Sequence, residues 1–201
     1  MKRVLLLGVD GLLGSCLENA LLNVLDLELI TTARNGSADH YFSYSPRGLS
    51  GLVREARPDI IVNCIAATSA RSSFLTMLRV NSFLPVQLAF IGVTRKSKVI
   101  HFSTNAVFSG MRSVNYETTV ALPRSKYGFT KLLGDLSFFK NLIIRASFVG
   151  SSTNSTVHTG LVMKLRNLEK NSTYEITEDY TWNGVTTDAI CEIIIGVVKQ
   201  K

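Results

Sequence analysis

The sequence predicts an α/β fold built on a doubly wound parallel sheet, and three observations lead to this prediction. Apolar segments of strand length alternate along the chain with segments of helical periodicity. The first such segment, Val4–Leu7, breaks at a glycine and passes directly into a helical pattern. A later one, Ile60–Val62, is apolar on both faces, as expected for a parallel strand that helices cover on two sides. We therefore expect parallel strands joined by right-handed crossovers.

Length and composition indicate that residues 1–201 form one globular domain. This length allows a sizeable core, and 46% of the residues are hydrophobic. The net charge of +7 is scattered, so an anionic small ligand, nucleic acid or a solvated surface explains it equally well. Cys16, Cys64 and Cys191 show neither metal spacing nor a disulfide framework, so we expect no metal site and reduced thiols in a cytoplasmic protein. We expect neither a membrane span nor a secretory signal.

The first helix is expected to start in the glycine-rich turn after Val4–Leu7. Its buried face is predicted to carry leucines at helical spacing: Leu13, Leu17, Leu21 and Leu25. The turn reads G-x-x-G-x-x-G, which differs from the commoner G-x-G-x-x-G dinucleotide motif. Plain helix packing therefore explains these glycines about as well as a bound ligand does.

The three glycines of this turn also suit a phosphate. Gly8 allows a tight turn, Gly11 lets the backbone approach a phosphate, and Gly14 lets the helix pack close to the strand. The helix start at Leu12 and Leu13 offers free N–H groups and the positive end of the helix dipole, which suit a pyrophosphate.

The second strand, Leu27–Thr32, ends without an acidic residue. In NAD-binding folds of this kind an acid at that point binds the adenosine ribose hydroxyls. Here Arg34 follows the strand instead, which makes it a candidate for gripping a 2′-phosphate and favours NADP over NAD. The alternative is an ordinary surface arginine.

The middle of the chain continues the alternation. We expect a third strand over Tyr41–Tyr44, a helix over Pro46–Ala56 and a buried strand over Ile60–Cys64. Cys64 is interpreted as an apolar filler, and the following Ile65, Ala66 and Ala67 are small enough for an adenosine to lie against the backbone. A helix is predicted over Phe74–Ile91, in which Asn81 faces either solvent or the interior.

Hydroxyl groups are predicted at the carboxyl edge of the sheet. They follow the strand Val99–Ser103, at Ser103-Thr104-Asn105, and open α/β sheets bind ligands at this edge. His101 lies within the strand and is interpreted as a satisfied interior histidine. In the helix predicted over Lys126–Phe138, Tyr127 and Lys131 share one face.

The last part of the chain should complete the domain with a few smaller elements. We expect a strand over Leu142–Arg145, a polar loop over Ser151–Thr156, a helix over Val157–Asn167 and a short strand over Tyr174–Ile176. Residues 151–187 would form the inserted elements of a reduced substrate lobe. The final helix, Thr187–Lys199, is predicted to bury Ile190, Ile193, Ile194, Val197 and Val198.

The glycine-rich turn, the Ser/Thr-bearing strand end and the later Tyr-x-x-x-Lys occur in a specific order. Together they resemble the short-chain dehydrogenase/reductase superfamily, in the extended branch that acts on nucleotide sugars, and most closely the dTDP-4-dehydrorhamnose reductase family. Five segments are similar to motifs of that family: Arg57–Asn63 (R-P-D-x-x-x-N), His101–Gly110 (S-T-D-x-V-F-x-G), Tyr116-Glu117 with Pro123, Tyr127–Lys131 (Y-G-x-[ST]-K) and Ile144–Gly150.

This resemblance implies a Rossmann-like NADPH- or NADH-dependent reductase of a keto-deoxy sugar nucleotide in surface polysaccharide or deoxysugar biosynthesis. Tyr127 would protonate the carbonyl oxygen, and Thr104 would orient it. Free tyrosine has a pKa of about 10, and Lys131 would lower it by on the order of three units and bind the nicotinamide ribose. The cofactor-binding set would be Gly8, Gly11, Leu12, Leu13, Arg34, Cys64, Ile65, Ala66, Ala67, Asn81, Tyr127 and Lys131.

Several positions depart from the family pattern. The aspartate after Ser-Thr is Asn105, the next tyrosine is Ala106, and an acidic position near the adenosine is Ser43. Phe148 replaces a tryptophan and could stack on a base, Arg71 places a cation near the cleft, and Trp182 either closes over the sugar or packs. The substrate-binding set would be Thr104, Asn105, Phe148, Arg71 and Trp182.

Two other functions remain open at this point. A non-catalytic NADP-binding regulatory or scaffold subunit of the same family is the first, because the substrate lobe is short. A basic nucleic-acid binder is the second, with only the net charge to support it. A sugar nucleotide is the expected partner, a homodimer is possible, and neither nucleic acid nor a membrane is expected.

Overall fold

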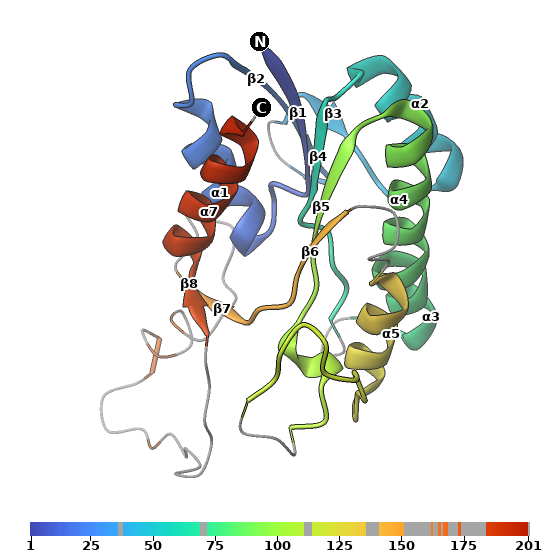
Figure 1. Cartoon of the computed structure of the whole chain (residues 1–201), viewed down its shortest axis with the longest axis vertical. Coiled ribbons are helices and arrows are strands. Elements are labelled where there is room, and N and C mark those ends of the chain that lie inside the picture. The colour runs from blue at the N-terminus through green and yellow to red at the C-terminus, as the bar shows by residue number, and fades with distance from the viewer. Residues whose placement is uncertain are drawn as a thin grey trace.

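The computed structural model describes residues 1–35, 38–68, 72–110, 114–135, 141–150 and 184–200, with single positions at 162, 165, 167, 168 and 173. Six strands form one parallel sheet in the order β3-β2-β1-β4-β5-β6 (Figure 1). The strands are β1 (Lys2–Leu7), β2 (Leu27–Ala33), β3 (His40–Tyr41), β4 (Ile60–Asn63), β5 (Lys98–Phe102) and β6 (Leu142–Ile144). The strand order reverses between β1 and β4, which creates a ligand-binding crevice in sheets of this kind. The predicted fold class is confirmed.

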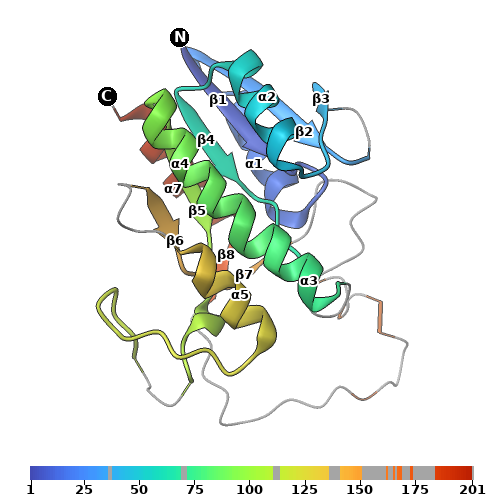
Figure 2. The same ribbon diagram turned by 90° about the vertical axis from the view of Figure 1, so that its right-hand side faces the viewer.

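Helices cover both faces of the sheet (Figures 1 and 2). One face carries α1 (Leu12–Leu22) and α7 (Thr187–Lys199). The other carries α2 (Pro46–Ala56), a long helix made of α3 (Phe74–Met77), η1 (Leu78–Phe83) and α4 (Leu84–Arg95), and α5 (Lys126–Gly134). A short 3-10 turn, η2 (Asn105–Val107), follows β5, and β7 (Phe148–Val149) pairs in parallel with β8 (Val185–Thr186).

Strand β1 lies at the centre of the core and supplies both of its halves. Val4 and Leu6 pack in the cluster under α1 and α7, whereas Leu5 and Leu7 pack in the cluster under α2 and α4. This division follows from the two-residue repeat of a strand. All four side chains are fully buried, which explains why the segment reads as an unbroken apolar run.

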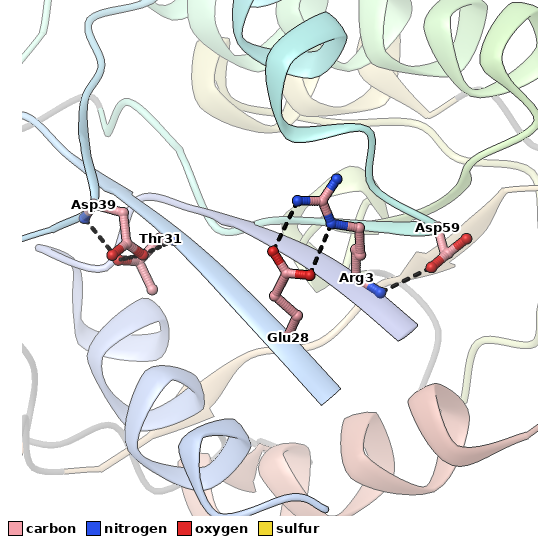
Figure 3. Close-up of polar contacts among 5 residues, drawn as sticks. All are labelled: Arg3, Glu28, Thr31, Asp39 and Asp59. Atoms are coloured by element: carbon pink, nitrogen blue, oxygen red, sulfur yellow. Dashed lines mark hydrogen bonds and ion pairs between the residues drawn. The ribbon is translucent and has the colours of Figure 1, made fainter. Parts of the chain in front are cut away.

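Polar contacts fix the strands next to β1 (Figure 3). Arg3 makes a bidentate contact with Glu28, at 2.8 and 2.9 Å, and its backbone N–H donates to Asp59. At the edge of the sheet, the Asp39 carboxylate accepts from the backbone N–H of Thr31 at 2.8 Å and from its hydroxyl at 2.9 Å. The Asp39 contact holds the short β3 beside β2, because β3 pairs with β2 over only two residues.

Four details of the predicted elements were wrong. The helix expected over Lys126–Phe138 ends at Gly134, where Asp135 is the C-cap. The α1 helix ends at Leu22, so Leu25 falls in the turn before Asp26 and is 90% exposed instead of buried. In α7, Ile193 points away from the face formed by Ile190, Ile194 and Val198, and it is 51% exposed. The third strand lies at His40–Tyr41 and not over Tyr41–Tyr44, because the Asp39 contact starts it earlier.

The helix predicted over Phe74–Ile91 continues to Arg95 and contains a π-helical segment at η1. At 22 residues, this helix is long and apolar enough to cross a membrane. It is the one such helix in the described part of the chain, whereas we expected none. It covers the sheet, and 44% of its most apolar window is buried in the fold. One such helix is weak evidence for a membrane.

The expected small substrate lobe falls largely outside the described residues. This holds for the predicted loop over 151–156, nearly all of the helix over 157–167, and the strand over 174–176. The final helix is found at its predicted bounds, with Thr186 as its N-cap.

Candidate active site

The glycine-rich turn forms a cradle for an anion at the start of α1. Gly8 has a φ of +88°, which only glycine adopts readily, and its N–H donates to the Thr32 carbonyl at 3.0 Å. A Cβ on Gly14 would lie 2.0 Å from the Gly8 carbonyl oxygen, so this glycine is needed for the close packing. Gly11 is the N-cap and offers no side-chain cap, which leaves the first N–H groups of α1 available to a ligand. The Leu13 side chain is buried, so only the backbone at Leu13 can take part.

Arg34 lies beside this cradle. Its backbone N–H donates to the Asp10 carboxylate at 3.3 Å, and its guanidinium Nε is 3.6 Å from the same oxygen. The Arg34 side chain is 71% exposed, so it is free to turn toward a ligand phosphate. The 2′-phosphate contact of Arg34 stays a prediction.

The segment after β4 runs along the same cradle. A Cβ on Gly8 would lie 2.9 Å from the Ile65 side chain and 3.4 Å from the Ile65 backbone nitrogen. Ala66 is exposed, while Ala67 is buried. Cys64 is partly exposed as a residue, but burial of its thiol raises the pKa strongly, which agrees with an inert filler.

Asn81 faces inward from the π-helical segment, as one of its two predicted orientations requires. Its amide oxygen accepts from the Ala67 N–H, and its amide nitrogen donates to the Ala67 carbonyl, both at 2.8 Å. The nitrogen also donates to the Thr130 hydroxyl at 3.1 Å. Asn81 is fully buried and both hydrogens of its amide are used, so it positions the 64–67 segment, and its predicted contact with a cofactor stays a prediction.

Two glycines seat α5 against its neighbours. A Cβ on Gly128 would lie 2.2 Å from the Ala106 carbonyl oxygen of η2, and one on Gly134 would lie 2.2 Å from the Asn81 carbonyl oxygen. The Ser125 hydroxyl caps the helix by accepting from the Gly128 N–H at 2.9 Å. The close approach of α5 to η2 therefore depends on glycine at position 128, and it brings Tyr127 beside Thr104.

Thr104 and Tyr127 meet at the carboxyl end of β5. The Thr104 hydroxyl caps η2 by accepting from the Ala106 N–H at 3.2 Å, and it lies near the Tyr127 phenol. Burial raises the pKa of Tyr127, and the nearby Thr104 hydroxyl acts in the opposite direction. We expected Lys131 to lower the pKa of Tyr127, and the described residues do not show this effect.

The reason is the position of Lys131. Its ammonium group turns inward, donates to the Phe102 carbonyl and lies 3.5 Å from Nε2 of His101. Lys131 is only 1% exposed, and burial lowers its pKa to about 8, although Asp135 and Cys64 act to raise it. Tyr127 and Lys131 do share one helix face, but the lysine contacts the sheet and not the phenol.

The expected substrate residues lie only partly within the described part of the chain. Asn105 turns its amide oxygen toward the Ser147 hydroxyl, which donates to it. Phe148 packs against the core cluster under α7, so the expected stacking on a base is not the contact that the structure shows. Arg71 and Trp182 lie outside the described residues.

The prediction missed the side chains behind Lys131. His101 was interpreted as a satisfied interior residue, which is correct, but its partners Asn63 and Lys131 were not foreseen. Asn63 and His101 occupy paired positions on β4 and β5. Polar residues at matching positions of two adjacent strands were the signal that could have revealed the pair.

Comparisons with known proteins agree with this fold. The chain is similar to the dTDP-4-dehydrorhamnose reductase of Escherichia coli K12, at 33% identity over 159 residues, which cover 73% of this chain and 51% of that protein. It therefore spans about half the length of that reductase. Two crystal structures share its fold at 21% identity, both of proteins named dTDP-4-dehydrorhamnose reductases.

The first of these structures is a hypothetical dTDP-4-dehydrorhamnose reductase from Sulfolobus tokodaii. It has a TM-score of 0.82, and the match covers 99% of this chain and 72% of that one. The second, from Bacillus anthracis and in complex with NADP, has a TM-score of 0.78 over 99% of this chain and 71% of its own. A family model described as the RmlD substrate binding domain matches residues 1–201. The family expected from the motifs is thereby confirmed, and the chain belongs to the RmlD substrate binding domain family.

Proposed function

We propose that this protein is an NADPH-dependent reductase of a keto-deoxy sugar nucleotide, acting in surface polysaccharide or deoxysugar biosynthesis. The observation that supports this most strongly is the close packing of α5 on η2, which brings the Tyr127 phenol beside the Thr104 hydroxyl at the carboxyl edge of the sheet. Similar proteins are named as dTDP-4-dehydrorhamnose reductases, which gives the substrate class.

The described residues fit a dinucleotide. The glycines at positions 8 and 11 would let a pyrophosphate approach the backbone closely, and the uncapped start of α1 would supply N–H donors for it. Arg34 stands beside the cradle as a cation for a 2′-phosphate, so we propose NADPH as the preferred cofactor and NADH as a poorer one. When bound, NADPH would supply a hydride.

The residues of the chain would then supply the proton and the positioning. Thr104 would orient the substrate carbonyl, and Tyr127 would donate its phenolic proton to the carbonyl oxygen. Because burial raises the pKa of Tyr127, the phenol stays protonated at neutral pH and can act as an acid. Lys131 would have to leave the Phe102 carbonyl to hold the ribose hydroxyls and to stabilise the phenolate that forms.

A non-catalytic NADP-binding subunit is the second candidate. The observation that favours it is the inward position of Lys131, which contacts Phe102 and not Tyr127. The position of Tyr127 beside Thr104 favours the enzyme, because a scaffold has no need of a phenol beside a hydroxyl at this edge.

The test is NADPH oxidation with a panel of 4-keto-6-deoxy nucleotide sugars. Replacing Tyr127 with Phe removes only the acidic proton, so turnover should fall on the order of a hundredfold or more while NADPH affinity stays nearly unchanged. Circular dichroism of Tyr127→Phe controls for folding. Wild-type protein that binds NADPH tightly but oxidises none with any sugar would support the non-catalytic candidate instead.

Location and partners are also part of the proposal. We propose a cytoplasmic protein whose partner is a sugar nucleotide and which binds neither nucleic acid nor membranes. Poor retention on heparin and no flotation with lipid vesicles would agree with it.

We also propose that the protein forms a homodimer through the outer face of η1 and α4. Phe83 and Phe90 are 63% and 61% exposed there, and they line an apolar groove of about 500 Å³ together with Tyr44 and Val86. Light scattering should give twice the chain mass, and Phe83→Ser with Phe90→Ser should give the monomer. A monomeric wild type would contradict the dimer, and a Val120→Ser variant, which removes another exposed apolar group, is the control.

A further inference from the structure

A row of three buried polar side chains lies directly behind the candidate active site. Asn63 is 1% exposed, His101 is 3% exposed and Lys131 is 1% exposed. The Asn63 amide nitrogen lies 3.1 Å from Nδ1 of the His101 ring, and Nε2 of that ring lies 3.5 Å from Nζ of Lys131. The row joins the 64–67 segment to the helix that carries Tyr127.

The orientation of Asn63 determines the tautomer of His101. The Asn63 amide oxygen accepts from the Ile65 N–H at 3.1 Å, so it is the NH₂ group that faces the ring. An amide NH₂ only donates, and Nδ1 must therefore be the accepting nitrogen. A neutral ring then carries its hydrogen on Nε2, the nitrogen that faces Lys131.

This tautomer has opposite effects on the two forms of Lys131. An uncharged amine has a lone pair, so it can accept from the Nε2 hydrogen and donate to the Phe102 carbonyl at the same time. An ammonium group has only donors, so one of its hydrogens would oppose the Nε2 hydrogen. The position that the structure shows thus matches the amine better than the ammonium.

The other charged groups around Lys131 are few. Asp135 ends the same helix, and its carboxylate favours the ammonium, but it is ion-paired with Arg145 at 2.8 Å. A Cys64 thiolate would act in the same direction, but the raised pKa of Cys64 keeps the thiol neutral. Burial lowers the pKa of His101 well below its usual value, and an ammonium at Lys131 would lower it further, so the ring stays neutral. The lowered pKa of Lys131 agrees with the match to the amine.

We propose that Asn63 and His101 are positioning residues that favour the uncharged amine of Lys131 while it lies against Phe102, so that the ammonium form leaves this position for the cofactor. The first half of this proposal concerns the protein alone. The second half rests on the proposed function, because it makes cofactor binding take up a proton at Lys131.

The first half is tested in the full chain without any cofactor. Long-range ¹H–¹⁵N correlation spectra distinguish the two histidine tautomers from the charged ring. The chain has only three histidines, His40, His101 and His158, so a His101→Gln variant assigns the signal. We expect the Nε2–H tautomer, unprotonated at neutral pH, and a hydrogen on Nδ1 or on both nitrogens would overturn the proposal.

A second measurement follows Lys131 itself, with ¹³Cε-labelled lysine and a Lys131→Met variant for assignment. In Asn63→Asp the carboxylate would accept from Nδ1–H, which moves the ring hydrogen and turns Nε2 into an acceptor for the ammonium. We expect the titration midpoint of Lys131 to rise from about 8 by roughly one unit or more.

The added carboxylate also raises this midpoint through its charge alone. The control is therefore Asn63→Asp in a His101→Phe background, where no ring can change its tautomer and the rise should be smaller. Equal rises in the two backgrounds would overturn the role of His101. The wild-type tautomer spectrum decides the matter by itself if a variant does not fold.

The second half is tested by calorimetry of NADPH binding in buffers of different ionisation enthalpy. At about pH 8.5 the free lysine is largely an amine, so binding should take up a fraction of a proton in the wild type and less in Asn63→Asp. Binding without proton uptake would overturn this half alone. A failure to bind NADPH would count against the proposed function as well, whereas the tautomer result stands independently of either.

Discussion

At the scale of single residues, the candidate site combines buried side chains that neighbours hold in place with one exposed side chain that can move. Thr104, Tyr127 and Lys131 are partly or fully buried and are held by neighbours. Arg34 is largely exposed and has only a 3.6 Å contact with Asp10. Thr104 and Tyr127 are therefore held in advance, whereas Lys131 would have to move, and Arg34, the group expected to select the cofactor, is adjustable.

The residue that tests cofactor selection is Arg34. Arg34→Ala should weaken NADPH binding on the order of tenfold or more and leave NADH binding nearly unchanged, because only NADPH carries the 2′-phosphate. Fluorescence titration with both nucleotides measures the two affinities. Equal losses for the two would remove the 2′-phosphate from the role of Arg34, and Arg47→Ala, on the distant helix α2, is the matched control.

At the scale of elements, α5 packs closely on its neighbours because two of its residues are glycines. The contacts of Gly128 with η2 and of Gly134 with η1 leave no space for a methyl group. The N-cap at Ser125 then fixes where the helix begins and thus which residue, Tyr127, reaches Thr104. The geometry of the candidate site depends on the close packing of α5, η1 and η2 as much as on its side chains.

The prediction at this scale concerns Gly128→Ala. A Cβ only 2.2 Å from the Ala106 carbonyl forces α5 away from η2, so turnover should fall on the order of a hundredfold as Tyr127 moves from Thr104. Gly51→Ala is the control, since a Cβ there meets nothing within 4 Å, and it should keep full activity. Normal turnover in Gly128→Ala would show that the two elements can separate without harm.

At the scale of the whole molecule, a buried lysine makes stability depend on pH. Its folded pKa of about 8 lies below its ordinary value of 10.5, so the unfolded chain binds more protons between these pH values. The free energy of unfolding should therefore rise with pH over this window. Below about pH 8, burial of the lysine lowers the free energy of unfolding by about 3 kcal/mol.

Urea denaturation of wild type and Lys131→Met isolates this contribution. The difference between the two proteins in free energy of unfolding should shift in favour of the wild type by about 3 kcal/mol between pH 8 and roughly pH 10.5. A difference that does not change with pH would show that Lys131 keeps its ordinary pKa in the fold.

The sequence predicted the architecture well because the relevant signals are local. The apolar run at Val4–Leu7, the proline that opens α2 and the helix over Thr187–Lys199 each follow from composition and periodicity, and each is found in place. The exposure of Leu25 could not be foreseen, because the leucine spacing continues past the residue where the turn begins.

The candidate site was predictable only as a set of residues. Motif order brought Thr104, Tyr127 and Lys131 together, but the direction of the lysine depends on a carbonyl and a ring from β5, which are tertiary neighbours. The inward amide of Asn81 likewise depends on the 64–67 segment, which lies on another element. Side-chain direction of this kind is set by packing and does not appear in periodicity.

The tie between the two ends of the described chain has a practical consequence. The Lys2 ammonium donates to the Val198 carbonyl at 2.9 Å and to that of Gln200, at the amino rim of the sheet (Figure 1). A surface anchor or a fluorescent reporter attached beside Lys2 would stand on the side of the molecule opposite the carboxyl edge of the sheet. Immobilised protein should therefore present this edge, which carries the candidate site, to the solution, and surface-based titration of nucleotides and sugars becomes a direct way to screen ligands.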